Sequence, residues 1–376
     1  MHVHFTSFTR GDKELSELVI SQLLRYFALS LVGLFIPLYL WSLNYSLDVI
    51  LFFYAMYFVF LIPLFFLGLC TTRYFGYKHT IAFSIPFLML YLFLLIRLET
   101  MQIPLTFIAF VAAVSSGLYW AGAHTTVAKN SSSKRRGRQV ALLQSSRIAF
   151  SIVSPLLGAG IILFFGYSRL FLVAMFLLFC SLLPFLVTRD RGYPFHFDFR
   201  LFFKEHNSRD AVFYFFEGFQ SFGYVTIWPL YLFVMGVSLV PLGLLFTIAA
   251  GLQFFVTLLM GKLTDQNKQF IKLGAMLQAL SFILLPFLHS LYSLGILTAF
   301  RNMTNPLLTT PFEKLYYDKA KTLFGIYVRE FWMDVGRICY AFILILCFSF
   351  TGGVQVALIA GLVLCAIGTS IMGWFT

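Results

Sequence analysis

Residues 47–69 read LDVILFFYAMYFVFLIPLFFLGL, an apolar run in which Asp48 carries the only charge. A helix of about 20 mainly apolar residues spans the hydrocarbon core of a bilayer. Similar runs recur along the whole chain, so the sequence predicts an α-helical protein that crosses a membrane many times. The composition agrees, because 60% of the 376 residues are apolar and 11% are charged. A soluble domain averages roughly 45–50% apolar and about 25% charged residues.

The runs are numerous enough for twelve membrane helices with short connections. We expect the first six at 17–41, 47–69, 79–97, 103–128, 140–166 and 168–188, and the second six at 211–236, 240–261, 270–289, 291–312, 323–350 and 353–375. The first run is longer than the 7–15-residue core of a signal peptide, so we expect it to be a retained helix.

Lys and Arg residues predict the orientation of the chain. When residues 1–16 are placed in the cytoplasm, the basic residues of the connections and helix ends fall on the cytoplasmic side, except Arg97 and Arg169. This distribution follows the positive-inside rule and predicts cytoplasmic termini in a plasma-membrane protein. It also explains the net charge of +12 without a nucleic-acid partner. The predicted organisation is an N-terminal segment (1–16), a six-helix bundle (17–188), a cytoplasmic linker (189–210) and a second bundle (211–376).

Two short motifs occur at matching places in the two halves. The stretch from Gly261 to Asp265 reads GKLTD and lies between the eighth and ninth predicted helices. The stretch 68–79 reads GLCTTRYFGYKH, between the second and third helices, with Thr72 where the first motif has its acid. Together with the twelve-helix layout they resemble the major facilitator superfamily (MFS), whose loop signature is G-x-L-x-D. The stretch 154–160, SPLLGAG, partly resembles the helix-5 motif of that family's proton-coupled exporters, but Ser154 and Ala159 replace glycines, so ordinary tight helix packing is the favoured interpretation.

The resemblance implies two pseudo-symmetric six-helix bundles and a central cavity lined by helices 1, 4, 7 and 10. Each of those predicted helices carries polar residues at helical spacing, and such a stripe should face a wet cavity rather than lipid. The candidates for substrate binding or coupling are Arg25, Tyr119, Trp120, His124, Glu217, Gln220, Tyr224, Arg301 and Asn305.

Glu217 is the carboxylate expected deepest in a cavity helix. A carboxylate that alternately pairs with an arginine and loses it can bind and release a proton, which would couple proton flow to conformational change. The favoured alternative is a static ion pair, with Arg25 or Arg301 as the partner, or a residue of the cytoplasmic end, because Glu217 lies only about two turns into its helix. Arg301 could instead bind an anionic group of the substrate. His124 is either a proton relay or a hydrogen-bonded structural residue.

The eleventh predicted helix carries Arg329, Glu330, Asp334 and Arg337. Asp334 and Arg337 are three residues apart and are expected to pair, whereas Arg329 and Glu330 point elsewhere. We interpret this cluster as part of a gate. The resemblance implies that Asp265, preceded by Gly261, latches a neighbouring helix end, and the start of helix 5 near Arg136 and Arg138 is the expected partner.

These features predict a secondary active transporter that moves a small solute by alternating access, with proton coupling and with export favoured over uptake. The alternatives are an uncoupled facilitator of the same fold, a receptor, or an intramembrane enzyme. Motifs of a hydrolase such as HExxH or GxSxG are absent from the sequence, so we expect no enzyme. We also expect no cofactor and no metal site. The expected partners are an unidentified small-molecule substrate, protons and the lipid bilayer, and the expected state is a monomer.

Overall fold

The computed structural model describes residues 10–130, 141, 144–145, 147–149, 151–186, 208–264, 270–319 and 323–374. Within these ranges the regular structure is entirely helical. The elements are α1 (Arg10–Gly33), α2 (Ile36–Ser42), α3 (Leu47–Phe75), α4 (Tyr77–Arg97), α5 (Leu105–Asn130), α7 (Ser154–Phe165), α8 (Tyr167–Leu182), η2 (Leu183–Leu186), α10 (Ser208–Phe222), η3 (Gly223–Ile227), α11 (Trp228–Val234), α12 (Leu239–Thr264), α13 (Phe270–Leu284), η4 (Leu285–Phe287), α14 (Leu291–Lys319), α15 (Leu323–Thr351) and α16 (Val354–Trp374).

Ten helical segments in the described ranges are long and apolar enough to cross a membrane. The predicted seventh and tenth helices fall outside this set. They correspond to α10–η3–α11 and to α14, which are helical at the expected places but carry more polar and charged residues. Polar side chains lower the hydropathy of a helix, and a membrane protein accepts them where they face its own interior. The all-helical membrane fold is thus confirmed, and the two predicted helices that fall outside this set are both ones expected to line a cavity.

The α-helical hydrogen-bond pattern is broken in the first and seventh predicted helices. The first helix stops and starts again, which corrects the sequence prediction, whereas the seventh stays helical from Ser208 to Val234 and contains a π turn. α1 ends at Gly33 and α2 begins at Ile36, with Pro37 in its first turn. In the seventh helix, Gly223–Ile227 is a wide π turn in which the N–H of Trp228 bonds to the carbonyl of Gly223. Pro229 follows it in the first turn of α11. Proline has no N–H and its ring displaces the carbonyl four residues earlier, which accounts for both interruptions.

These two breaks reveal a repeat between the halves. Residues 37–40 and 229–232 both read PLYL, and each stretch lies directly after the break in its helix. Both short helices end in the same way: Asn44 and Gly236 adopt positive φ angles of 62° and 90°, and their N–H groups bond to the carbonyls of Trp41 and Phe233. Such an ending is favoured by Gly and tolerated by Asn. The equivalent geometry supports an internal duplication.

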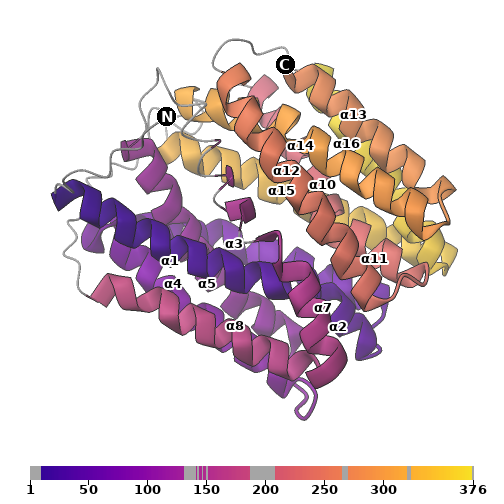
Figure 1. Cartoon of the computed structure of the whole chain (residues 1–376), viewed down its shortest axis with the longest axis horizontal. Coiled ribbons are helices and arrows are strands. Elements are labelled where there is room, and N and C mark those ends of the chain that lie inside the picture. Colours follow the sequence, from indigo (N-terminus) through magenta and orange to yellow (C-terminus); the bar gives the residue numbers. More distant parts are fainter. Residues whose placement is uncertain are drawn as a thin grey trace.

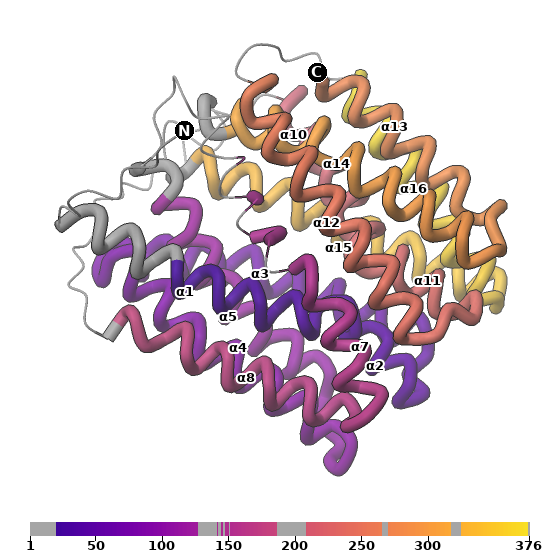
Figure 2. Tube along the Cα trace, viewed as in Figure 1, coloured from indigo at the N-terminus to yellow at the C-terminus, as the bar shows by residue number. Residues whose placement is uncertain are grey.

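The helices form two bundles that follow the two halves of the sequence (Figure 1). In the first bundle α3 and α4 pack on α5, and α1 packs on α8. In the second, α12 and α13 pack on α14, and α10 packs on α15 and α16. The bundles meet mainly where α15 packs on α3 and α12 packs on α7. Figure 2 shows the helices of both bundles running in the same general direction, with α3 and α15 near the centre.

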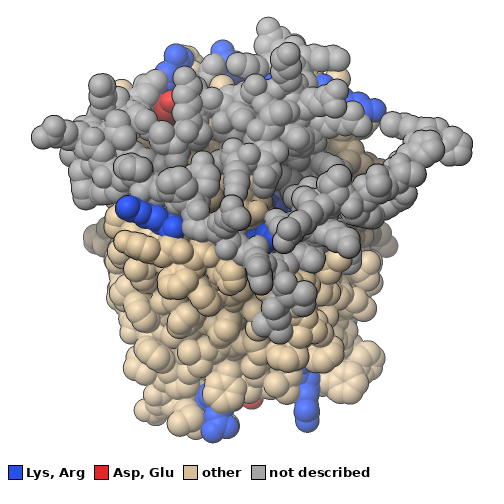
Figure 3. Space-filling model, turned by 90° about the vertical axis from the view of Figure 1, so that its left-hand side faces the viewer, with Lys and Arg blue, Asp and Glu red and all other residues tan. Residues whose placement is uncertain are grey.

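The surface has the distribution of charge expected of a bilayer protein. On the face shown in Figure 3, Lys and Arg lie at both ends, with a broad band of other residues between them. Many exposed side chains elsewhere are large and apolar, including Phe164, Phe176 and Phe255. In water such a surface would be unfavourable, whereas lipid is itself apolar.

Candidate functional site

A central cavity of about 360 Å³ lies between the two bundles. The first bundle supplies most of its walls, from α1, α3, α4 and α5, and the second bundle adds residues of α10, η3 and α15. Arg25, Tyr119 and Trp120 line it, as expected from the sequence. Its volume lies within the range of about 300–1,000 Å³ that is typical of small-molecule sites.

Arg25 is the most buried charged group of this cavity, with 3% of its surface exposed. Its guanidinium carbon lies 3.9 Å from the centre of the Tyr119 ring. Its Nη1 donates a hydrogen bond to Ser84 Oγ at 3.2 Å. Tyr119 also shares a hydrogen bond with Tyr26 through the two hydroxyls. An aromatic face and one hydroxyl therefore hold the guanidinium in place at the cavity wall.

A second cavity of about 170 Å³ is lined by charged side chains at the end of the molecule where α10 and α15 begin. Around it lies a charged network of six residues: His124, Glu217, Arg329, Glu330, Asp334 and Arg337. No group of His, Cys, Asp and Glu in the described ranges is arranged to hold a metal ion. The contacts that the described residues make in this network are ion pairs.

Arg329 is the centre of this network. Its Nη2 lies 3.4 Å from Glu217 Oε1, and its Nη1 lies 3.8 Å from Glu330 Oε1. Glu217 was expected to pair, if at all, with Arg25 or Arg301, so Arg329 is an unforeseen partner. The other carboxylate oxygen of Glu217, Oε2, is buried and has no hydrogen-bond partner among the described residues. Part of this carboxyl group is therefore available to a proton.

Arg337 pairs with Asp334, as their spacing predicted. The Nη1 of Arg337 donates to Asp334 Oδ1 at 2.7 Å, and its Nε donates to Ser221 Oγ at 3.2 Å. Asp334 is buried, and Arg337 reaches from the charged network to the wall of the central cavity. This ion pair therefore stands between the two cavities.

Two glycines bring the helices of the network close together. A Cβ at Gly218 would collide with the carbonyl oxygen of Met333, and one at Gly336 would collide with the carbonyl oxygen of Phe215. Small residues allow this close approach of helix backbones in membranes. The contact of α10 with α15 places Glu217 beside Arg329.

His124 connects the network to the other bundle. Its Nε2 lies 3.3 Å from Glu330 Oε1, so this buried contact joins α5 to α15. The imidazole stacks on Trp120, with ring centres 5.3 Å apart. An imidazole that carries two protons makes such a contact an ion pair, whereas a neutral imidazole makes it a hydrogen bond.

Arg301 lies apart from both cavities. It is fully buried in the second bundle, and its guanidinium carbon is 3.4 Å from the centre of the Tyr224 ring, with Phe282 and Trp228 nearby. None of its side-chain nitrogens has a hydrogen-bond partner among the described residues. The expected alternative of a pair with Glu217 is wrong, because the guanidinium is enclosed by aromatic rings instead.

The remaining predicted residues lie outside the two cavities or outside the described ranges. Tyr224 donates a hydrogen bond to Asn302 Oδ1 at 2.6 Å. Gln220 is buried in α10, and Asn305 is partly buried in α14. Gly261 lies in the last turn of α12, whereas Asp265 and its expected partners Arg136 and Arg138 are outside the described residues, so the predicted latch stays a prediction.

Several cavity residues were missed by the sequence analysis. Tyr54 and Tyr57 on α3 and Tyr91 on α4 line the central cavity, and Glu313 on α14 lines the charged one. The two tyrosines of α3 are three residues apart and would face one side of a helix. That spacing was a usable signal within an otherwise apolar run. The sequence of α4 offered no comparable pattern.

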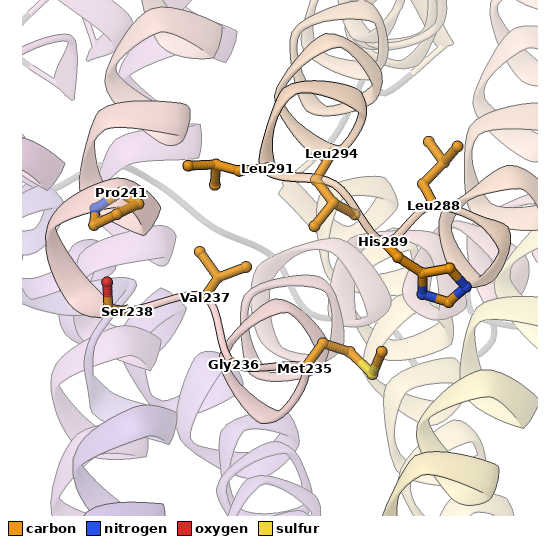
Figure 4. A pocket seen from close by; sticks show the side chains of 9 residues that line it. All are labelled: Met235, Gly236, Val237, Ser238, Pro241, Leu288, His289, Leu291 and Leu294. Atoms are coloured by element: carbon orange, nitrogen blue, oxygen red, sulfur yellow. The ribbon is translucent and has the colours of Figure 1, made fainter.

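A third cavity, of about 220 Å³, lies at the opposite end of the second bundle (Figure 4). The α11–α12 connection forms one side of it and residues 288–294 form the other. Its lining contains Ser238 and His289 but none of the charged residues described above. It is therefore separate from the central cavity and the charged network.

Comparisons with known proteins agree on the fold. The sequence model described as Major Facilitator Superfamily matches residues 18–339. The human organic anion transporter MFSD10 (TETRAN) superposes with a TM-score of 0.67 at 13% identity, covering 97% of this chain and 100% of that one. A variant of the E. coli fucose:proton symporter FucP superposes with a TM-score of 0.67 at 14% identity, covering 96% of this chain and 97% of that one. No curated protein sequence matches the chain.

Proposed function

This chain belongs to the Major Facilitator Superfamily, and we propose that it is a proton-coupled secondary transporter of a small solute. Its family makes it a membrane transporter and not an enzyme. The observation that carries the coupling proposal is the buried contact of His124 with Glu330, which joins the two bundles and continues through Arg329 to Glu217.

The balance of charge supports proton binding in this network. Three carboxylates, Glu217, Glu330 and Asp334, lie near two guanidiniums, those of Arg329 and Arg337. Arg147 and Glu313 line the same cavity and add one charge of each sign. An uncompensated charge is unfavourable in a buried site. One proton, on His124 or on a carboxyl group, would balance the described members of the network.

Protonation would also act on the contact between the bundles. A protonated His124 attracts the Glu330 carboxylate as an ion pair, whereas a neutral one offers a hydrogen bond at most. Loss of the proton therefore weakens the link between α5 and α15 at this end of the molecule. Separation of the bundles at one end and closure at the other is the alternating-access movement of such transporters. In this proposal Glu217 exchanges the proton with the cavity.

The similar structures bear on coupling but not on the solute. FucP is named as a proton symporter, which is compatible with coupling in this fold. MFSD10 is named as an organic anion transporter, whereas FucP carries fucose, so one fold serves unlike solutes. The coupling proposal therefore depends on the charged network of this chain.

The test is the internal pH of proteoliposomes, reported by a trapped dye while candidate solutes are added outside. We expect one solute to trigger proton movement in the wild type, Glu217→Gln to abolish that movement, and His124→Gln to slow it. Glu99→Gln is the matched control, because Glu99 is an exposed carboxylate that lies just after the C-terminal end of α4 and lines neither cavity.

Solute flux without proton movement would show an uncoupled facilitator and leave Glu217 as part of a structural ion pair. Proton movement that persists in both variants would place the coupling site elsewhere.

We propose export as the direction of transport. We also propose that the protein is a monomer in the plasma membrane and that both termini lie in the cytoplasm. The support for export is the SPLLGAG stretch, in which Pro155 packs on Gly243 of α12 and Gly158 packs on Leu31 of α1. Flux in right-side-out and inverted vesicles from one preparation would decide the direction when the gradient of the cell is kept, with acid at the extracellular face. The lumen of the inverted vesicles is then acidic, so an exporter that exchanges solute for protons concentrates its solute in those vesicles, whereas an importer concentrates it in the right-side-out ones.

A further inference from the structure

The described side chains that line the central cavity include two arginines and no carboxylate. One of the two, Arg337, is neutralised by Asp334 at 2.7 Å. The other, Arg25, has no ion pair among the described residues, and its Nε has no hydrogen-bond partner. The cavity therefore carries one buried positive charge without a counter-charge from the described residues.

The surroundings of Arg25 do not compensate this charge. Ser84 accepts one hydrogen bond from it, and the face of Tyr119 offers only the weak attraction of a π system. A charged group in the interior of a membrane protein normally meets a partner of opposite charge or functions in binding. Because Arg25 lines an open cavity, an anion that enters can supply the missing charge through a guanidinium fork.

The other side chains that line the cavity indicate the shape and polarity of the uncharged part of such a ligand. Four tyrosines join Tyr119 around the cavity, and most of the other side chains that line it are aliphatic or aromatic, with three hydroxyl side chains among them. The four are Tyr26, Tyr54, Tyr57 and Tyr91, and the hydroxyl side chains are Ser116, Ser221 and Thr226. Aromatic walls favour flat apolar groups through edge-to-face and stacked contacts. Tyrosine hydroxyls provide hydrogen bonds without adding charge.

We propose that the central cavity binds a small organic anion, with its single negative charge at Arg25 and a flat apolar body between the tyrosines. This inference rests on the proposed transport function and adds the class of substrate. Arg25 is the recognition residue, and the tyrosines select the shape of the ligand.

The test compares three probes that share one body and differ in charge. Radiolabelled 2-naphthoate is bound at equilibrium to the full-length protein in lipid nanodiscs, with empty nanodiscs to subtract partitioning into lipid. Unlabelled 2-naphthamide and 2-naphthylmethylammonium then compete for the site. We expect saturable binding of the anion, and competition by the neutral and cationic probes that is at least tenfold weaker.

Variants of Arg25 then test whether its guanidinium is the group that binds the anion. We expect Arg25→Gln to weaken naphthoate binding at least tenfold and Arg25→Lys to retain the preference for the anion. The control Arg169→Gln removes an exposed arginine outside the cavity and should bind as the wild type does. The comparison of probes on the wild type needs no variant, so it tests the proposal even where Arg25→Gln fails to fold.

The proposal is wrong if naphthoate shows no saturable binding, if the amide or the cation competes equally, or if Arg25→Gln binds like the wild type. Binding is measured without a proton gradient, so it separates this inference from the function. Anion-selective binding without proton movement in proteoliposomes would refute the coupling alone. Proton movement triggered only by neutral or cationic solutes would refute the anion site alone.

Discussion

The Nε2 of His124 and the Oε1 of Glu330 lie 3.3 Å apart, and this buried contact joins a helix of one bundle to a helix of the other. His124 and Glu330 are far apart in the sequence, yet their helices α5 and α15 meet at this point. Glu330 also lies beside Arg329, which contacts Glu217. A change of protonation at one end of this chain of contacts therefore acts on the interface between the bundles.

The first prediction concerns that contact. His124→Gln and Glu330→Gln should each slow proton-coupled transport, and the double variant should be little slower than either single one. Residues in direct contact show coupling energies of about 0.5–3 kcal/mol. The first substitution already removes the contact, so the second has no further contact to remove. Initial transport rates of the four proteins form the double-mutant cycle. Additive losses would mean that the two side chains act independently.

Asp334→Asn should destabilise the protein strongly. It leaves the partly buried Arg337 without its charged partner, and breaking a buried ion pair costs up to about 3–5 kcal/mol. Adding Arg337→Met should recover most of the loss, since it removes the orphaned charge. Thermal unfolding in detergent gives the comparison. If the double variant is less stable than Asp334→Asn, the pair is not the source of the effect.

Arg301 should respond differently. Its guanidinium has aromatic neighbours but no hydrogen-bond partner among the described residues. A buried charge without a counter-charge carries a desolvation cost that an apolar side chain of similar size does not have. We expect Arg301→Met to unfold at or above the wild-type temperature, while Gln278 still donates to the backbone carbonyl at position 301. A decrease in unfolding temperature as large as that of Asp334→Asn would reveal a charge partner for Arg301.

Gly218→Ala should push α10 away from α15. The added methyl group would meet the backbone of α15 at Met333, which cannot move as a flexible side chain can. Overpacking of this kind costs about 1–3 kcal/mol and would also displace Glu217. Gly160→Ala is the control, because a Cβ there meets nothing within 4 Å. Unfolding temperatures and transport rates should fall for Gly218→Ala only, and equal behaviour would refute the close contact.

The orientation is testable with two cysteines at opposite ends of α4. Tyr74 and Thr100 are both exposed and lie just beyond its two ends, at Tyr77 and Arg97. In a background without native cysteines, Thr100→Cys should react with an impermeant maleimide in intact cells. Tyr74→Cys should react only after permeabilisation, because the connection between α3 and α4, which carries Arg73 and Lys78, is expected to face the cytoplasm. The reverse pattern would invert the predicted topology.

The sequence by itself determined the class of protein and the approximate positions of the spanning helices. Long apolar runs have few alternatives to membrane helices, because the backbone must satisfy its own hydrogen bonds in lipid. The pairing of Asp334 with Arg337 was also predictable, since both residues lie on one helix face. The breaks before Pro37 and Pro229 were visible as prolines, and the shared PLYL stretch was a signal that the prediction of continuous helices overlooked.

Only the tertiary structure decided which charges meet. Helical spacing fixes neighbours within one helix, whereas partners on different helices depend on how the helices rotate and pack. Glu217 therefore lies beside Arg329 rather than Arg301, and His124 beside Glu330, because the glycine contacts of α10 with α15 and the contact of the two bundles bring those side chains together. The same packing encloses Arg301 among aromatic rings and leaves Arg25 at an open cavity without a carboxylate among its described neighbours.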